Sequence, residues 1–75
     1  ALPIYHPVAI AVSFSARENE VLRLVTKGYT NLQIASLLSI SANTVKTHMN
    51  NIFNKLGVND RTQAAVYATR HHIVD

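Results

Sequence analysis

The segment SANTVKTHMNNIFNKLG (residues 41–57) predicts an amphipathic helix, and the other predicted elements of this chain hold it in place. At about 3.6 residues per turn, its apolar residues fall in one sector, which we expect to face the core: Val45, Met49, Ile52, Phe53 and Leu56. The opposite sector is polar with a single full charge: Asn43, Lys46, Thr47, Asn50 and Asn54. Asn and Thr side chains both donate and accept hydrogen bonds, so this sector favours contact with the edges of bases in DNA.

A third row of polar side chains flanks the base-facing sector of the same helix. It consists of Thr44, His48, Asn51 and Lys55, spaced four, three and four residues apart, and it holds hydrogen-bond donors and no carboxylate. We expect this row to lie where the wall of a DNA groove passes. The helix is therefore predicted to face the core on one side, bases on another and phosphates on its flank.

The length and composition indicate one small folded domain. The chain has 75 residues, of which 48% are hydrophobic and 15% charged, and it has no Cys, which excludes disulfides and thiolate metal sites. The net charge is only +3, but no acidic residue stands between Glu20 and Asp60. Four cations lie in that interval: Arg23, Lys27, Lys46 and Lys55. This distribution favours a polyanionic partner, although a solvated surface carries such charges too.

The amino-terminal residues 1–13 contain both prolines and are predicted to form an extended interdomain linker before a domain at residues 14–75. The first residue is Ala and not Met, so we expect that the chain has been cut from a longer polypeptide or processed. No run of about 18 apolar residues exists, so we expect no segment in a membrane.

Three capping boxes predict where helices begin. Each has an N-cap side chain followed three residues later by Glu or Gln: Ser15 with Glu18, Thr30 with Gln33, and Asp60 with Gln63. With Ser41 as a further N-cap, the boxes predict an all-α four-helix bundle with helices at about 16–27, 31–38, 42–56 and 61–72. Only three residues separate the second helix from the third, so these two helices are predicted to cross steeply as a helix-turn-helix.

The apolar sides of the other helices complete the predicted core. We expect it to include Val21, Leu22, Leu24 and Val25 of the first helix, Ile34, Ala35, Leu37 and Leu38 of the second, and Ala64, Tyr67, Ala68 and His71 of the last. This leaves an uncharged stripe on the last helix, formed by Thr62, Val66, Thr69 and the end residue Ile73. Such a stripe favours self-association, because helix-turn-helix proteins gain affinity by pairing two half-sites; alternatively, both sides of the helix are covered.

The segment FSARENEVLRLVTKGYTNLQIASLLSISANTVKTHMNNIFNKLGVNDRTQAA, which begins at residue 14, resembles a known family. It is similar to the LuxR/FixJ-type DNA-binding domain, the four-helix output module of bacterial response regulators and quorum-sensing receptors. The resemblance extends to about residue 70. Its markers include Arg17-Glu18, Thr30-Asn31, Ile34-Ala35, Thr44-Val45-Lys46, Lys55-Leu56-Gly57-Val58 and Arg61-Thr62. Each marker is weak alone, but together at these spacings they are specific.

The resemblance implies a role for each polar row. It places the helix at 42–56 in the major groove, with base contacts by Asn43, Lys46, Thr47 and Asn50. Phosphate contacts are expected from Thr30, Asn31, Thr44, Asn51 and Lys55, and dimer contacts from Thr62, Val66 and Thr69. Thr47 and Asn50 occupy positions at which members of the family differ, so no target sequence carries over.

The resemblance also implies a cellular setting. Double-stranded DNA, a second copy of the chain and RNA polymerase are the expected partners, in the cytoplasm of a bacterium. The parent chain is expected to carry an amino-terminal receiver domain of a two-component system, or alternatively the sensor domain of a quorum-sensing receptor.

Other functions find less support in the sequence. The four histidines, His6, His48, His71 and His72, are not spaced to converge on a metal, and no cofactor is expected. No nucleophile elbow or glycine-rich loop is present, so the chain is not expected to be an enzyme. The main alternative is a helical protein-interaction module, which would differ from a DNA-binding domain in its weak response to salt.

Overall fold

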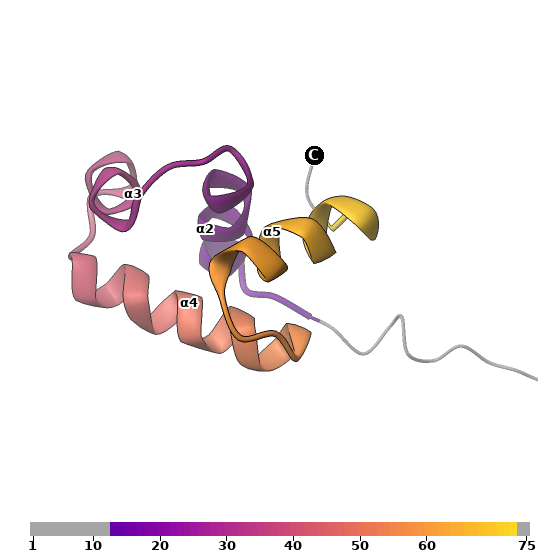
Figure 1. The fold of residues 1–75 in the computed structure, drawn as a ribbon. Coiled ribbons are helices and arrows are strands. Elements are labelled where there is room, and N and C mark those ends of the chain that lie inside the picture. The colour runs from indigo at the N-terminus through magenta and orange to yellow at the C-terminus, as the bar shows by residue number, and fades with distance from the viewer. Residues whose placement is uncertain (1–12, 74–75) are drawn as a thin grey trace, which may run out of the picture.

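The computed structural model describes residues 13–73 and shows four α-helices with no strand in that range (Figure 1). The helices are α2 (Ala16–Thr26), α3 (Asn31–Leu38), α4 (Ala42–Leu56) and α5 (Arg61–Arg70). Helices α2 and α4 each pack against the other three, and α3 and α5 lie on either side of α2 (Figure 1). The predicted all-α bundle with a helix-turn-helix is confirmed. The predicted linker lies outside the described residues, except for Ser13.

Helix starts follow from local hydrogen bonds that the sequence predicted. The Ser15 hydroxyl accepts from the Glu18 amide at 3.1 Å, while the Glu18 carboxylate accepts from the Ser15 amide at 3.0 Å. Thr30 and Gln33 make the same reciprocal pair at 3.2 and 2.9 Å, and the Ser41 hydroxyl accepts from the Thr44 amide at 3.0 Å. These bonds satisfy amide donors that have no partner within the first turn.

The third predicted capping box forms only in part. The Asp60 carboxylate accepts from the Gln63 amide at 2.8 Å, as expected of an N-cap. However, the Gln63 side chain accepts from the amide of Asn59 at 2.9 Å, one residue before the cap, and does not close the box on Asp60.

Helix α5 ends at Arg70, two residues before the predicted end, and α2 ends at Thr26 with Lys27 as its C-cap. His72 has a left-handed backbone with φ of 53°, and the Ile73 amide donates to the Ala68 carbonyl at 2.9 Å. This is a Schellman closure, in which the left-handed residue turns the chain and satisfies the last carbonyls. Ile73 packs against the core, so the prediction that it forms part of an exposed stripe was wrong.

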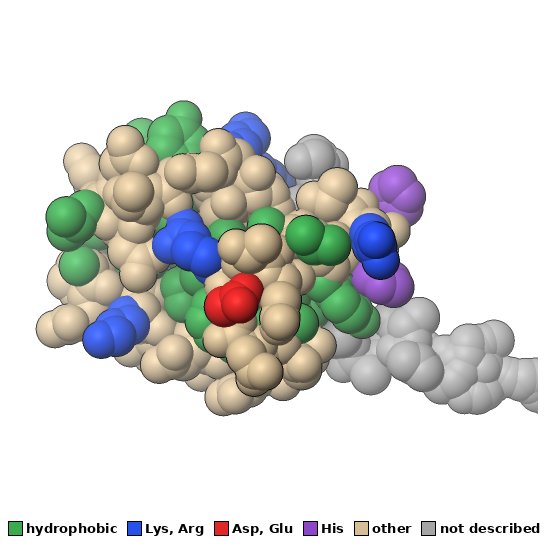
Figure 2. All heavy atoms as spheres, in the orientation of Figure 1, with side chains coloured by type: hydrophobic (Ala, Val, Ile, Leu, Met, Phe, Trp, Pro, Cys, Tyr) green, Lys and Arg blue, Asp and Glu red, His purple; other side chains and the backbone are tan. Residues whose placement is uncertain are grey.

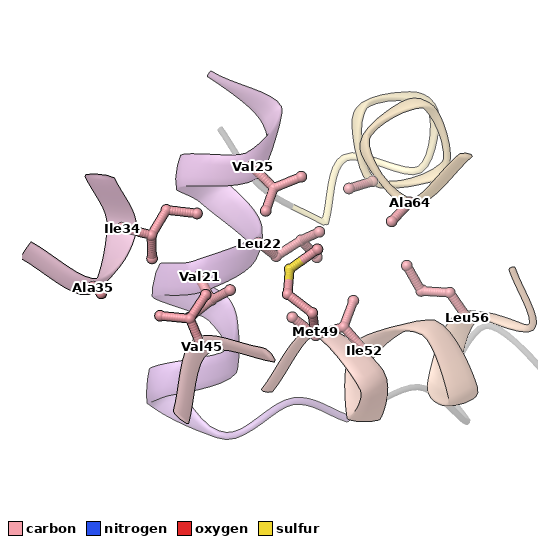
Figure 3. Packing of buried hydrophobic residues seen from close by; sticks show 11 residues of the cluster. Val21, Leu22, Val25, Ile34, Ala35, Val45, Met49, Ile52, Leu56 and Ala64 are labelled. Carbon is pink, nitrogen blue, oxygen red and sulfur yellow. The ribbon is translucent and has the colours of Figure 1, made fainter. Parts of the chain in front are cut away.

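The core draws on all four helices (Figure 3). Its buried residues are Val21, Leu22, Val25, Ile34, Ala35, Val45, Met49, Ile52, Leu56, Ala64 and Ala68. In Figure 3, Met49 of α4 points toward Leu22 of α2. Phe53, Leu24, Leu38 and Tyr67 are half-buried around this cluster. Because the apolar side of α4 packs against α2, α3 and α5, the polar side of α4 faces outward.

Two residues predicted for the core are exposed. Leu37 is 57% exposed, because at about 100° per residue it lies on the other side of Ile34 from Leu38 and misses the buried sector. His71 is exposed and stacks on the ring of Tyr67 at 4.2 Å between centroids. The sector predicted to be buried was therefore too wide on both helices.

The turn between α3 and α4 depends on a residue that the sequence did not single out. Ser39 adopts a left-handed backbone with φ of 57°, and the Ile40 amide donates to the Ala35 carbonyl at 3.0 Å. Half-buried Ile40 then packs against the core, and Ser41 starts α4. This reversal sets the steep crossing of the two helices.

Candidate nucleic-acid interface

The four residues predicted to contact bases share the outward side of α4. Asn43, Lys46, Thr47 and Asn50 are all exposed, opposite the buried residues of the same helix. Figure 2 shows one face of the molecule, on which separate Lys and Arg side chains lie among uncharged surface, with hydrophobic side chains and one acidic group between them. Helix α4 contains no Asp or Glu. Nothing on α4 itself would therefore repel the phosphates that border a groove.

The hydroxyl of Thr47 already has a partner within the helix. It donates to the Asn43 carbonyl at 3.1 Å, which leaves the Thr47 oxygen as an acceptor. The side chains of Asn43, Lys46 and Asn50 make no hydrogen bond to another residue in the range 13–73. They keep their full hydrogen-bonding capacity for a ligand.

The flank of α4 is partly engaged within the protein. Thr44 and Asn51 are exposed, and the Thr44 hydroxyl shares a hydrogen bond with Ser41 at 2.8 Å. Lys55 is bound more firmly, because its ammonium donates to Glu18 at 2.6 Å and to the Ser13 carbonyl at 2.9 Å. One N–H of the ammonium is still available, so the expected phosphate contact of Lys55 stays a prediction.

Glu18 is the acidic residue that holds Lys55 in place. Its side chain is 8% exposed, and the ammonium of Lys55 together with the amide of Ser15 keeps the pKa of this carboxyl below its usual range. The pair joins the start of α2 to the end of α4. Its first role is therefore to hold the orientation of α4 on the bundle.

His48, which lies in the same flanking row, is half-buried, and its Nδ1 atom is buried without a hydrogen-bond partner. In the part of the chain that the structure describes, no three side chains of His, Cys, Asp or Glu converge as a metal site would require. Within residues 13–73 no helix has the length and apolarity needed to cross a bilayer.

The amino end of α3 lies beside the base-facing row and is tied to α5. Thr30 is exposed and Asn31 half-buried. The guanidinium of Arg61 donates from Nη1 to the Asn31 amide oxygen at 2.9 Å and from Nη2 to the Tyr29 carbonyl. An open groove of about 360 Å³ separates these groups from α4, and it is lined by Asn31, Lys46, Met49, Asn50, Phe53, Asn59, Asp60 and Arg61.

The contacts of Arg61 were missed by sequence reasoning, which used this residue only as a marker of the resemblance. Its partners lie 30 and 32 residues away, and no periodicity or spacing connects positions so far apart. The groove shows that Asn31, Lys46 and Asn50 line one surface, as the separate predictions for base and phosphate contacts require.

The outer side of α5 presents the stripe expected to contact a second copy. Thr62, Val66 and Thr69 are exposed, and Val66 is 47% exposed, which is high for an aliphatic side chain. Shallow hollows flank Val66, one of them lined by Val58, Thr62, Gln63, Val66, Tyr67, Arg70 and His71.

With this geometry in place, comparison with known proteins identifies the chain. The family model described as bacterial regulatory proteins, luxR family, matches residues 12–68. This chain belongs to the luxR family. The four-helix fold that contains the helix-turn-helix of α3 and α4 is thus a LuxR-type DNA-binding domain, and its function is DNA binding in transcription regulation.

The sequences of known response regulators support this luxR assignment. The response regulator protein VraR of Staphylococcus aureus is 53% identical over 58 residues, which are 77% of this chain and 28% of VraR. VraR of Staphylococcus epidermidis gives the same values. This chain therefore spans about 28% of the length of these curated relatives.

Solved structures of luxR-type proteins share the fold. The response regulator ChrA of a heme-sensing two-component system has a TM-score of 0.80 and 44% identity, over 83% of this chain and 31% of ChrA. The transcription factor GerE has a TM-score of 0.76 and 34% identity, over 83% of this chain and 92% of GerE.

Proposed function

We propose that this luxR-family domain binds double-stranded DNA by inserting α4 into the major groove, with Asn43, Lys46, Thr47 and Asn50 toward the bases. The observation that carries the proposal is the outward row of these four exposed side chains on a helix without acidic residues. Lys46 suits the O6 and N7 atoms of guanine, and the two asparagines suit adenine. Thr30, Asn31, Thr44, Asn51 and Lys55 would contact phosphates on either side.

The length of the row limits the size of the half-site. From Asn43 to Asn50 the helix rises by about 10 Å, at about 1.5 Å per residue. Successive base pairs of B-DNA are about 3.4 Å apart, so the row spans about four base pairs. One copy of the domain would therefore read a short core, which is too little to define a unique site alone.

A fluorescence-anisotropy titration of labelled duplexes tests the proposal. Binding should weaken steeply as salt rises, because cations on the protein displace counterions from the phosphates. Lys46→Ala should weaken binding to a selected site about tenfold and relax the preference for guanine. Lys27→Ala is the matched control, since Lys27 is exposed at the end of α2 and lies about 180° around that helix from its core side.

The outcome separates DNA binding from the alternative of a protein-interaction module. If no duplex binds even at low salt, the proposed function is wrong. If Lys46→Ala and Lys27→Ala behave alike, α4 is not the reading helix.

We propose further that two copies pair through α5, with Val66 at the centre of the contact between Thr62 and Thr69. Val66→Glu should lower the affinity for a duplex carrying two half-sites and leave the affinity for a single half-site unchanged, because a carboxylate at the centre of an isologous contact meets its own copy. Equal loss on both duplexes would contradict pairing through this stripe.

The parent protein is proposed to be a bacterial response regulator that acts in the cytoplasm. The similarity to VraR and ChrA, each of which is much longer than this chain, supports an additional receiver domain in the parent. RNA polymerase is a proposed partner of the DNA-bound dimer. Phosphorylation of the full parent and measurement of its affinity for DNA would test this arrangement.

A further inference from the structure

Two cations make the long-range side-chain hydrogen bonds in the described part of the chain, and the function proposed above employs only one of them. Lys55 joins α4 to α2, whereas Arg61 joins α5 to the turn before α3. Every other side-chain hydrogen bond within residues 13–73 spans three or four positions. Arg61 therefore fixes where the amino end of α3 lies relative to the rest of the bundle.

The bond from Arg61 also determines which way the amide of Asn31 points. A carboxamide has an acceptor oxygen and a donor NH₂ group on opposite sides. The guanidinium binds the oxygen at 2.9 Å, so the NH₂ group is directed away from Arg61. A DNA phosphate only accepts hydrogen bonds, so this orientation suits a phosphate contact and the flipped amide does not.

The second bond of Arg61 fixes the backbone around the same amide. Nη2 donates to the carbonyl of Tyr29, one residue before the N-cap Thr30. The planar guanidinium thus holds both the side chain of Asn31 and the chain entering α3. A lysine, which has a compact ammonium group and no rigid fork, cannot reproduce this paired geometry.

We infer that Arg61 is a positioning residue for DNA binding: it holds the amide of Asn31 ready to donate to a backbone phosphate at the edge of the groove that α4 enters. The inference rests on the proposed function, because it needs the amino end of α3 to meet DNA. The open groove lined by both residues together with Lys46 and Asn50 supports it, since a phosphate contact there sits beside the base-facing row.

A double-mutant cycle on the 75-residue chain tests the inference. Arg61→Met removes the donors while retaining much of the apolar stem, and Asn31→Ala removes the amide. Each should weaken duplex binding about tenfold at a temperature where all variants are folded, and the double variant should be no weaker than the weaker single variant. Arg61→Lys should bind the duplex about as weakly as Arg61→Met does. Asn31→Asp should bind DNA poorly although it can still pair with Arg61, because a carboxylate cannot donate to a phosphate.

Other outcomes overturn the inference. If Arg61 contacts a phosphate itself, Arg61→Lys will retain most of the affinity and the two losses will multiply. If Arg61 is only structural, Arg61→Met will lower the melting temperature and leave the affinity of the folded domain unchanged.

Lys46→Ala, measured in parallel, separates this inference from the proposed function. Failure of the wild-type chain to bind any duplex would refute the proposed function. Normal wild-type binding that is weakened by Lys46→Ala but not by the Arg61 variants would refute only the positioning role.

Discussion

Replacing Glu18 with glutamine should lower the free energy of unfolding of this small domain. The Glu18 carboxylate is 8% exposed and accepts from the Lys55 ammonium at 2.6 Å and from the Ser15 amide at 3.0 Å. Glutamine keeps the shape and one acceptor oxygen, so the variant removes the charge and little else. The comparison therefore measures the charge-assisted part of two hydrogen bonds.

The size of the loss follows from the partners of Glu18. A hydrogen bond to a charged group stabilises by about 1.5–3 kcal/mol, against about 0.5–1.5 kcal/mol between neutral groups. The Lys55 side chain is 38% exposed, so water screens part of its contribution. We expect a total loss of about 1.5 kcal/mol, which would lower the melting temperature by roughly 6–12 °C in a domain of this size.

The pH dependence gives the decisive measurement. The pKa of Glu18 is lowered in the folded state by the Lys55 ammonium and then the Ser15 amide, so the ionised carboxylate stabilises the fold. Its contribution is complete above the unfolded value near 4.5 and is lost as the pH falls through the lower folded pKa. Urea unfolding of the wild type and Glu18→Gln should therefore differ at pH 7 and converge in acid.

Glu20→Gln is the matched control for this prediction. Glu20 pairs with Arg17 at 3.3 Å on the same helix, but the two side chains are 49% and 40% exposed. Such a pair contributes about 0.5 kcal/mol or less. A Glu18→Gln variant as stable as Glu20→Gln, or a stability difference from wild type that does not change with pH, would refute the reasoning.

Three further changes test the fold by thermal unfolding. Ser39→Gly should stabilise it by about 0.5–1 kcal/mol, because Ser39 has a φ of 57° that glycine adopts without strain; destabilisation would contradict the left-handed turn. Gly57→Ala should cost about 1 kcal/mol, although a Cβ there meets no atom within 4 Å, because φ is 70°; no loss would show that the backbone relaxes. Ile52→Ala should cost about 2–5 kcal/mol, since Ile52 is fully buried; a loss below about 1 kcal/mol would place it outside the core.

Much of the fold could be predicted because its signals are local. The N-caps Ser15, Thr30 and Ser41 and the apolar period of α4 act within one or two turns, and the structure confirms each of them. The exposed row on α4 was predictable for the same reason, since placing Val45, Met49 and Ile52 in the core forces Lys46 and Asn50 outward.

Predictions failed where a residue's neighbours come from elsewhere in the chain or where the backbone reverses. Gln63 found the amide of Asn59 instead of closing its box, and α5 stopped at Arg70 because His72 turned left-handed and Ile73 reached the core. Leu37 lies outside the sector that α2 and α4 cover. The periodicity of a single helix does not report how wide the covered sector is.

Periodicity and capping were thus enough to specify four helices, a helix-turn-helix and a polar row facing away from the core, because those features depend on residues within about four positions of one another. Packing of the bundle was needed to bring Lys55 to Glu18, 37 residues away, and Arg61 to Asn31, 30 residues away. Such pairs form only after the helices have docked, since their geometry depends on the whole chain and not on any segment of it.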